Sequence, residues 1–430
     1  AELLVKCACH PSISFSMSCF GVFTGTYYRN LPEFRDEVMR PFVPELFESF
    51  SSKCARGAGD PEQPDAPDYV LLDFDSSDEY WESFSALRSH AALIIRHLTS
   101  IDPVSCVNNA NQMLMNVTNV LGPFEGDAVT EEGCASMESR AFCVWDQASF
   151  VFENVMQGLE EHSASIQAES GQLIQELEAM AQVILELDLK DPVLLPKLLD
   201  CVGALGWLVL SQSDDTLMLS LIDKCFATMT FSLPGNSNRV SADTKAARRK
   251  GFTSFIKLTK RLSDRLLPYL ENIVEQATSM WSSGAIHWAE VSFIFDSLAT
   301  LSNAMEDPFK QQGFLMEMLG FALEEWNGPT IQAVVGDPLY LLVLMEAIPM
   351  PDGCPFENPA ETRTLFHSLI NIFVSVSRRV KNIENNGGIF NAFCEVESVI
   401  APGIMAVIQS LHCLWKPDFL AVEGIFRFLL

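Results

Sequence analysis

Long apolar runs are missing from this sequence, and basic residues are scarce. The longest apolar stretches, 202–210 and 340–345, fall short of the roughly 18–20 residues that a membrane-spanning helix needs, and no signal peptide is recognisable. Only 28 Lys and Arg stand against 56 Asp and Glu, which leaves a net charge of −28. A surface this acidic repels nucleic acid and anionic membranes except where basic residues are concentrated. We therefore expect a soluble, intracellular protein that makes no contact with a membrane.

Motifs of catalysis and of cofactor binding are also missing. The chain has no glycine-rich phosphate loop, no G-x-S-x-G nucleophile elbow and no H-E-x-x-H pair. Its 12 cysteines are scattered and form no disulfide framework. Cys7, Cys9 and His10 cluster, but no second ligand pair follows at the spacing of a zinc site, and the acidic run 73–79 lacks the spacing of a calcium loop. We therefore expect no enzyme, no metal and no cofactor.

Helical periodicity, in contrast, runs from one end of the chain to the other. Residues 172–189, QLIQELEAMAQVILELDL, place apolar side chains at i, i+3, i+4 and i+7. The same pattern predicts helices at 83–100, 104–121, 141–159, 193–210, 216–231, 244–262, 266–281, 286–305, 308–326, 362–380, 390–408 and 418–430. No sustained alternation of period two is present, so we expect almost no sheet.

Asp-Pro pairs mark several of the predicted helix starts. The aspartate side chain accepts hydrogen bonds from the free backbone N–H groups at the start of a helix. Proline has no backbone N–H, and it is favoured at the first helical position because an N–H there would have no partner within the helix. The pairs are Asp102-Pro103, Asp191-Pro192, Asp307-Pro308 and Asp337-Pro338. Such helices with short connections predict an all-α fold, a superhelical HEAT-repeat α-solenoid of antiparallel helix pairs.

The length of 430 residues exceeds the roughly 250–300 at which a single core stops growing. We therefore expect one continuous HEAT-type array over 1–430, with about ten repeats of the usual length. Loops near 52–69, 122–138 and 348–361 should lie on the surface of this array and connect its helices. The chain begins without Met and ends in an apolar stretch, which indicates an internal piece of a longer array, since complete solenoids carry polar caps.

Basic charge is concentrated in one window of the chain. Between Arg239 and Arg265 lie nine Lys and Arg against two acidic residues, so the window carries +7 and the remainder of the chain −35. At roughly 100° per residue, one face of the predicted helix is basic and the opposite face is apolar. The basic face holds Lys245, Arg249, Lys250, Thr253, Lys257, Lys260 and Arg261. The apolar face holds Phe252, Phe255, Leu258 and Leu262.

Two interpretations of the basic face stay open. It is either a solvated charged surface or the binding site of an anionic partner. Like charges one helical turn apart cost a few tenths of a kcal/mol per pair, and few acidic residues lie between these cations to relieve them. A partner carrying phosphates, or an acidic protein segment, would balance the charge. A second basic run, Arg378-Arg379-Lys381, is shorter.

A series of short segments, in a fixed order, carries a family resemblance. They are Cys9-His10-Pro11-Ser12, Leu72-Asp73-Phe74-Asp75-Ser76 with Asp78-Glu79 and Arg88, Ile101-Asp102-Pro103, Lys190-Asp191-Pro192, Ala247-Arg248-Arg249 with Ser254-Phe255-Ile256-Lys257, Leu266-Leu267-Pro268, Leu301-Ser302-Asn303 and Phe314-Leu315-Met316-Glu317. Together they cover most of residues 7–330. On this ordered set the chain resembles the exportin-5 (HASTY-type) nuclear export receptors of the importin-β/karyopherin superfamily.

The resemblance implies a HEAT solenoid that shuttles between nucleus and cytoplasm, contacts nucleoporins, and binds cargo together with Ran-GTP. The implied cargo is a short hairpin of double-stranded RNA with a 3′ overhang, such as a microRNA precursor, held through its phosphates. Proteins are the other cargo class that the superfamily implies. A generic HEAT scaffold or regulatory protein for protein–protein assembly is the alternative function.

The resemblance also implies particular site residues. Arg249 and Thr253 match the inner-face helix that receives the overhang, with Arg248 and Lys257 as neighbours. A further, polar overhang-contacting position of the family falls near 287–288, where this chain has the aromatic pair His287-Trp288. The full set expected to bind RNA or other cargo is Lys245, Arg248, Arg249, Lys250, Thr253, Lys257, Lys260 and Arg261.

Overall fold

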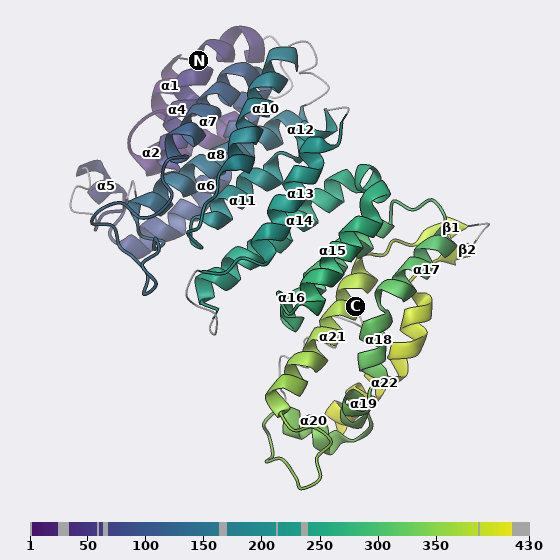
Figure 1. Cartoon of the computed structure of the whole chain (residues 1–430). Helices are drawn as coiled ribbons and strands as arrows, with labels where there is room; N and C mark the ends of the chain where they lie inside the picture. The colour runs from purple at the N-terminus through teal and green to yellow at the C-terminus, as the bar shows by residue number, and fades with distance from the viewer. Residues whose placement is uncertain are drawn as a thin grey trace. The chain divides into compact units, whose positions relative to one another are not determined.

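The computed structural model describes residues 2–24, 34–57, 60–62, 68–162, 170–211, 214–233, 240–385 and 388–414. Helices dominate these residues, and the all-α class is confirmed. The described strands, β1 (Ile383–Asn385) and β2 (Gly388–Phe390), form one short antiparallel ribbon in which Ile383 pairs with Phe390. The chain divides into two compact units, Ala1–Ser254 (unit 1) and Phe255–Leu430 (unit 2), and each is described by itself (Figure 1).

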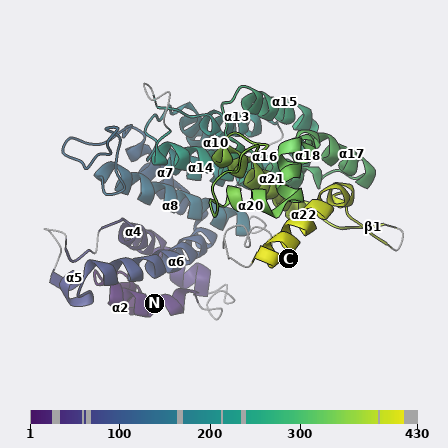
Figure 2. The same ribbon diagram turned by 90° about the horizontal axis from the view of Figure 1, so that it is seen from below.

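Unit 1 is built around two rows of helices, which can be followed in Figures 1 and 2. Row A consists of α6 (Ser77–Ile101), α8 (Arg140–Glu161), α11 (Leu195–Ala204) and the part of α14 (Ala242–Leu266) up to Ser254. Row B consists of α4 (Val43–Lys53), α7 (Pro103–Val117), α10 (Ser170–Glu186) and α13 (Thr216–Met229). Within each row a helix packs on the next one. At the end of row A, α14 packs on α11, where Ser254 Oγ donates to the carbonyl of Leu199 at 3.1 Å.

The turn between α6 and α7 explains how the chain passes from row A to row B. Asp102 alone separates the two helices, and its Oδ1 accepts a hydrogen bond from the N–H of Ser105 at 3.1 Å. Pro103 occupies the first position of α7, as the Asp-Pro pattern predicts. Because α7 packs back on α6 after this turn, the two helices form the antiparallel pair expected of a HEAT-type repeat.

Helices α6 and α8 of row A run in the same direction. Arg88 and Arg96 of α6 bond to Asp146 and Asn154 of α8 at 2.6 and 3.0 Å, and each pair is separated by 58 residues in sequence. A constant separation means that α6 and α8 are parallel, since in an antiparallel pair the separation would change along the helices. Successive repeats therefore stack with equivalent helices side by side.

The remaining helices of unit 1 flank these rows. They are α1 (Glu2–Ala8), α2 (Ile13–Thr24), η1 (Phe34–Met39), η2 (Arg40–Phe42), α5 (Asp68–Asp73) and α12 (Gly206–Leu210). The carboxylate of Asp73, at the end of α5, accepts hydrogen bonds from Ser12 Oγ and the N–H of Ile13, both at 2.7 Å. These bonds satisfy free donors at the start of α2 and hold α5 against it.

Unit 2 consists of helices packed around an aromatic core. Beyond η4 (Leu267–Tyr269), they are α15 (Leu270–Ser282), α16 (Trp288–Ser302), α17 (Pro308–Met318), α18 (Gly320–Asn327), α19 (Pro329–Gly336), α20 (Pro338–Leu344), α21 (Pro359–Arg379) and α22 (Cys394–Leu414). Trp326 of α18 is only 1% exposed and packs edge-on against Phe373 of α21, with ring centroids 5.6 Å apart. A Cβ at Gly403 of α22 would come within 2.9 Å of the Trp326 ring, so only glycine allows this approach.

Several predicted helix boundaries are wrong. The helix expected at 193–210 begins at Leu195 and divides into α11 and α12, and the one expected at 308–326 divides at Leu319 into α17 and α18. After Asp191 the helix begins at Leu195 rather than at Pro192, but the Asp191 side chain caps the turn that leads into α11. Its Oδ1 accepts hydrogen bonds from the N–H groups of Val193 and Leu194 at 2.9 and 3.2 Å. Asp307 and Asp337 cap α17 and α20. The helix expected at 418–430 lies outside the described residues.

The loop 122–138 contains no helix, and its base is fixed. Val129 and Ala135 form an isolated antiparallel bridge, and Gly126 and Gly133 adopt positive φ values of 82° and 75°. The carboxylate of Asp191 accepts the N–H of Ala135 at 2.7 Å, which ties the loop to the start of α11. The predicted loop 348–361 is free of helix up to position 358, and α21 begins within its last three positions, at Pro359. The predicted loop 52–69 includes positions outside the described ranges. The single continuous array stays a prediction.

Within the described ranges, none of the helices combines the length and the apolar character that crossing a membrane requires.

Candidate cargo-binding surface

Helix α14 has the two faces that its sequence predicts. Phe252, Phe255 and Leu258 are fully buried, and Leu262 is 1% exposed. On the same buried side, a Cβ at Gly251 would lie 3.1 Å from the carbonyl oxygen of Cys225 in α13, so the missing side chain lets α13 and α14 approach closely. The opposite, basic face of α14 is therefore turned away from the helices on which it packs.

Four of the predicted binding residues are exposed along that face. They are Lys245, Arg249, Lys257 and Lys260, whereas Thr253 and Arg261 are half-buried. Among the described residues, Lys245 and Lys260 form no ion pair or hydrogen bond through their side chains. Thr253 Oγ1 donates to the carbonyl of Lys250 at 3.0 Å, which fixes its rotamer. The helix passes from unit 1 to unit 2 between Ser254 and Phe255, so Lys257, Lys260 and Arg261 belong to unit 2.

The other two predicted binding residues hold α14 in place. Lys250 forms an ion pair with Asp200 of α11. Arg248 Nε donates to the carbonyl of Phe231, just beyond α13, at 2.8 Å. Both side chains bond to other parts of unit 1. They are therefore half-buried at the edge of the basic face, whereas Lys245 and Arg249 are exposed on it.

Within the two rows of unit 1, basic residues are concentrated in row A. The cations of row A are Arg88, Arg96, Arg140, Lys197, Lys245, Arg248, Arg249 and Lys250. Row B has only Lys53 and Lys224, and both ammonium groups are turned inward, donating to the carbonyls of Ala8 at 2.7 Å and Leu187 at 2.6 Å. Burial lowers the pKa of Lys53 to about 8 and also lowers the pKa of Lys224. Of the two rows, row A therefore presents the exposed cations that an anionic partner would contact.

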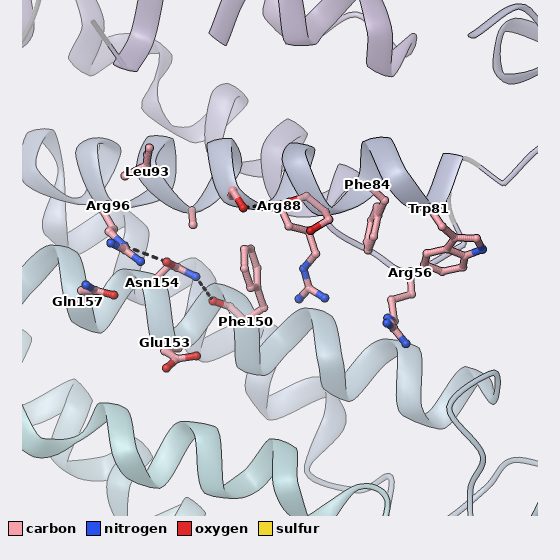
Figure 3. Close-up of a pocket in the computed structure, with 13 residues that line it drawn as sticks. Arg56, Trp81, Phe84, Arg88, Leu93, Arg96, Phe150, Glu153, Asn154 and Gln157 are labelled. Carbon is pink, nitrogen blue, oxygen red and sulfur yellow. Dashed lines mark hydrogen bonds between the residues drawn. The ribbon is translucent and has the colours of Figure 1, made fainter. Parts of the chain in front are cut away.

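A second basic cluster in row A was not predicted. A groove of about 760 Å³ lies between α6 and α8, and three arginines line it: Arg56, Arg88 and Arg96. Figure 3 shows Arg88 between the other two along the groove. Trp81, Phe84, Leu93 and Phe150 supply apolar walls, and Glu153, Asn154 and Gln157 supply polar groups.

At one end of this groove, a single buried carboxylate forms ion pairs with several cations. Asp146, whose side chain is 3% exposed, lies 2.6 Å from Arg88 Nη1, 2.5 Å from Lys197 Nζ and 3.7 Å from Arg56 Nε. Burial alone would raise the pKa of Asp146, but Lys197 and Arg88 hold that pKa below its usual range. Asp146 is therefore ionised, and it balances only one of the three positive charges around it.

The groove could have been predicted from the sequence, because two pairs of polar residues have the same spacing. Arg88 and Arg96 are eight residues apart on α6, and Asp146 and Asn154 are eight residues apart on α8. Residues eight apart lie close to the same helical face, so two such pairs on parallel helices can meet twice. Arg56, which follows α4, has no comparable signal.

The remaining sequence candidates have structural roles. The backbone N–H of His287 donates to Glu290 at 2.9 Å at the start of α16, and Trp288 packs edge-on against Trp281 with centroids 5.3 Å apart. In the second basic run, Arg379 pairs with Asp296 of α16. In the part of the chain that the structure describes, no three His, Cys, Asp or Glu side chains are grouped as the ligands of a metal ion would be.

A sequence model of the Exportin-5 family matches residues 3–422, nearly the whole chain. The chain belongs to the Exportin-5 family. Exportin-5 of Mus musculus is 23% identical over 328 residues, which are 74% of this chain and 26% of that protein. Exportin-5 of Homo sapiens is 22% identical over 345 residues, 76% of this chain and 27% of that protein. The chain thus spans about a quarter of the length of these relatives.

Proposed function

We propose that this chain is part of a nuclear export receptor that carries small structured RNA, such as microRNA precursors, from nucleus to cytoplasm together with Ran-GTP. The family match supports the export role. The observation that supports RNA as cargo is the exposed basic face of α14 in a chain of net charge −28. The receptor would shuttle between the two compartments and contact nucleoporins on the way.

The exposed cations suit a shape-based grip on a duplex. Double-stranded RNA is recognised through its phosphates and 2′-hydroxyls, because its deep major groove hides the bases from side chains. Lys245 and Arg249 would each meet one phosphate of the backbone. The Thr253 hydroxyl, whose hydrogen is held by the carbonyl of Lys250, keeps lone pairs that can accept a 2′-hydroxyl of the overhang.

A salt titration of hairpin RNA binding, in the presence of Ran-GTP, tests this proposal. Each phosphate contact contributes roughly 0.7–0.9 to the slope of log K against log salt. Lys245→Ala and Lys260→Ala remove exposed cations without breaking an ion pair, so each should lower the slope by about one contact. Lys190→Ala is the matched control, since Lys190 is an exposed lysine outside row A that pairs with Asp188.

Two results would count against RNA as cargo. One is the absence of binding at low salt with Ran-GTP present. The other is a slope that Lys245→Ala and Lys260→Ala leave unchanged. Capture by Ran-GTP separates the receptor from the alternative of a general scaffold, because a scaffold has no reason to distinguish Ran-GTP from Ran-GDP. Retained capture without RNA binding would point to protein cargo.

A further inference from the structure

The groove between α6 and α8 lies on row A but shares no lining residue with α14, so its function can be examined apart from RNA binding. We propose that it is a docking site for an acidic, extended segment of a partner protein, in which carboxylates alternate with apolar side chains. The proposal does not depend on the identity of the exported cargo.

The end of the groove around Asp146 carries more positive than negative charge. Arg56, Arg88 and Lys197 surround the single carboxylate of Asp146, which leaves two positive charges without a nearby anion in that cluster. The Nε of Arg56 is buried and makes no hydrogen bond. Partly buried charges interact more strongly than charges in bulk water, so this excess is unfavourable until an anionic group enters the groove.

Aromatic rings fix the guanidinium groups before any partner binds. The guanidinium carbon of Arg88 lies 4.1 Å from the ring centroid of Phe150, and that of Arg56 lies 5.4 Å from Trp81 and 5.5 Å from Phe142. Arg96 is held by Asn154, whose Oδ1 accepts its Nε–H at 3.0 Å, and by Glu161, whose carboxylate lies 3.5 Å from its Nη1 and is exposed enough for a peptide carboxylate to replace it. Because the three side chains are already ordered, a ligand loses little free energy in ordering them.

The lining favours a peptide over a nucleic acid. Trp81 is 38% exposed and Leu93 41% exposed, and such apolar surface is suited to aliphatic side chains rather than to a phosphate backbone. Glu153 lies in the same groove and would repel a continuous row of phosphates. Its carboxylate and the amide of Gln157 can instead bond to the N–H and C=O groups of a peptide backbone.

The spacing of the arginines suits an extended chain. Arg88 and Arg96 are eight residues apart on α6, which corresponds to about 12 Å along the helix at roughly 1.5 Å per residue. Carboxylates four residues apart in an extended peptide are about 13 Å apart at roughly 3.3 Å per residue. In a segment where glutamate and an apolar residue alternate, one carboxylate can thus meet Arg88 while the second carboxylate after it, four residues on, meets Arg96.

The test uses a fluorescent peptide in which glutamate and leucine alternate, and a counterpart with glutamine in place of glutamate. We expect the glutamate peptide to bind at low salt, the glutamine peptide to bind at least tenfold more weakly, and Arg56→Gln and Arg96→Gln each to weaken the glutamate peptide about fivefold or more. Arg140→Gln is the matched control, because Arg140 is an exposed arginine of α8 outside the groove.

A variant at an exposed apolar position guards against effects of misfolding. Leu93 is exposed and belongs to no ion pair, so Leu93→Asp should leave the fold intact. The added negative charge should weaken binding of the glutamate peptide about fivefold. Equal peptide affinity in Arg96→Gln and Arg140→Gln would refute the proposal. Loss of hairpin RNA binding in the groove variants, with peptide binding unchanged, would refute it as well and would assign the groove to nucleic acid.

Discussion

Replacement of Asp146 by asparagine is the sharpest test of how row A is held together. The side chain is 3% exposed and lies 2.6 Å from Arg88, 2.5 Å from Lys197 and 3.7 Å from Arg56. Asparagine keeps the shape of aspartate but removes the charge. Three cations from three segments of unit 1 would then repel one another with no carboxylate among them.

The expected cost follows from the burial of this group. Removing one partner of a buried ion pair costs roughly 3–5 kcal/mol. The three cations keep side-chain exposures of 33%, 17% and 21%, so solvent screens part of their repulsion, and we take the lower end of that range. A loss of about 3 kcal/mol corresponds to a change of about a hundredfold in a local opening equilibrium.

Hydrogen exchange measured by mass spectrometry can follow this loss in individual helices. Amides of α8 in Asp146→Asn should exchange about a hundredfold faster than in the wild type, while Glu82→Gln, an exposed change on α6, should have no effect. The pKa of Asp146 is lowered in the fold, so its contribution is present above the ordinary value of about 3.9 and is lost as pH falls through the lowered value. The asparagine variant should lack this acid-dependent component.

A double-mutant cycle decides whether the carboxylate acts through charge. Lys197→Met should destabilise the wild type, because it removes an ion-pair partner. In the Asp146→Asn background the same change should stabilise α8, because it removes an unbalanced cation. The charge argument is wrong if Lys197→Met has the same effect in both backgrounds.

Three further outcomes can be checked on single positions. Gly251→Val should destabilise α13 and α14 by about 1–3 kcal/mol, seen as faster exchange of both, because its Cβ would press on the carbonyl of Cys225. At pH 8, Cys394, which is exposed, should react with a maleimide well before the buried Cys225, whose thiol pKa burial raises, and labelling in the reverse order would contradict the fold. Because burial lowers the pKa of Lys53 to about 8, protection of α4 should increase as pH rises from about 8 towards the ordinary lysine value of about 10.4, and Lys53→Met should remove this increase.

Features that depend on adjacent residues could be predicted from the sequence. Asp102, Asp307 and Asp337 cap helices as expected, because a cap needs only the aspartate and the donors two or three residues later. Asp191 caps its turn in the same way through Oδ1, but its other oxygen also accepts the N–H of Ala135, 56 residues away. Nothing in the neighbouring sequence indicates that contact.

The same distinction applies to the two basic clusters. The basic face of α14 belongs to one helix, so helical periodicity alone separates Lys245 and Lys257 from the buried Phe255. The arginine groove combines α6, α8 and Arg56, and its shape depends on how parallel helices stack. Which of the α14 cations are used for packing also could not be predicted, because the partner of Lys250 is Asp200 on another helix.

The fixed base of the loop 122–138 has a practical consequence for reporter design. Ala135 is anchored by Asp191 and the bridge to Val129, whereas Glu131, Glu132 and Gly133 at the tip are exposed. A fluorophore or affinity tag inserted between Glu131 and Glu132 would extend the tip and leave the anchored base intact. The label would then stand at a defined point of unit 1, on neither α14 nor the arginine groove, from which energy transfer to a labelled RNA or peptide could be measured.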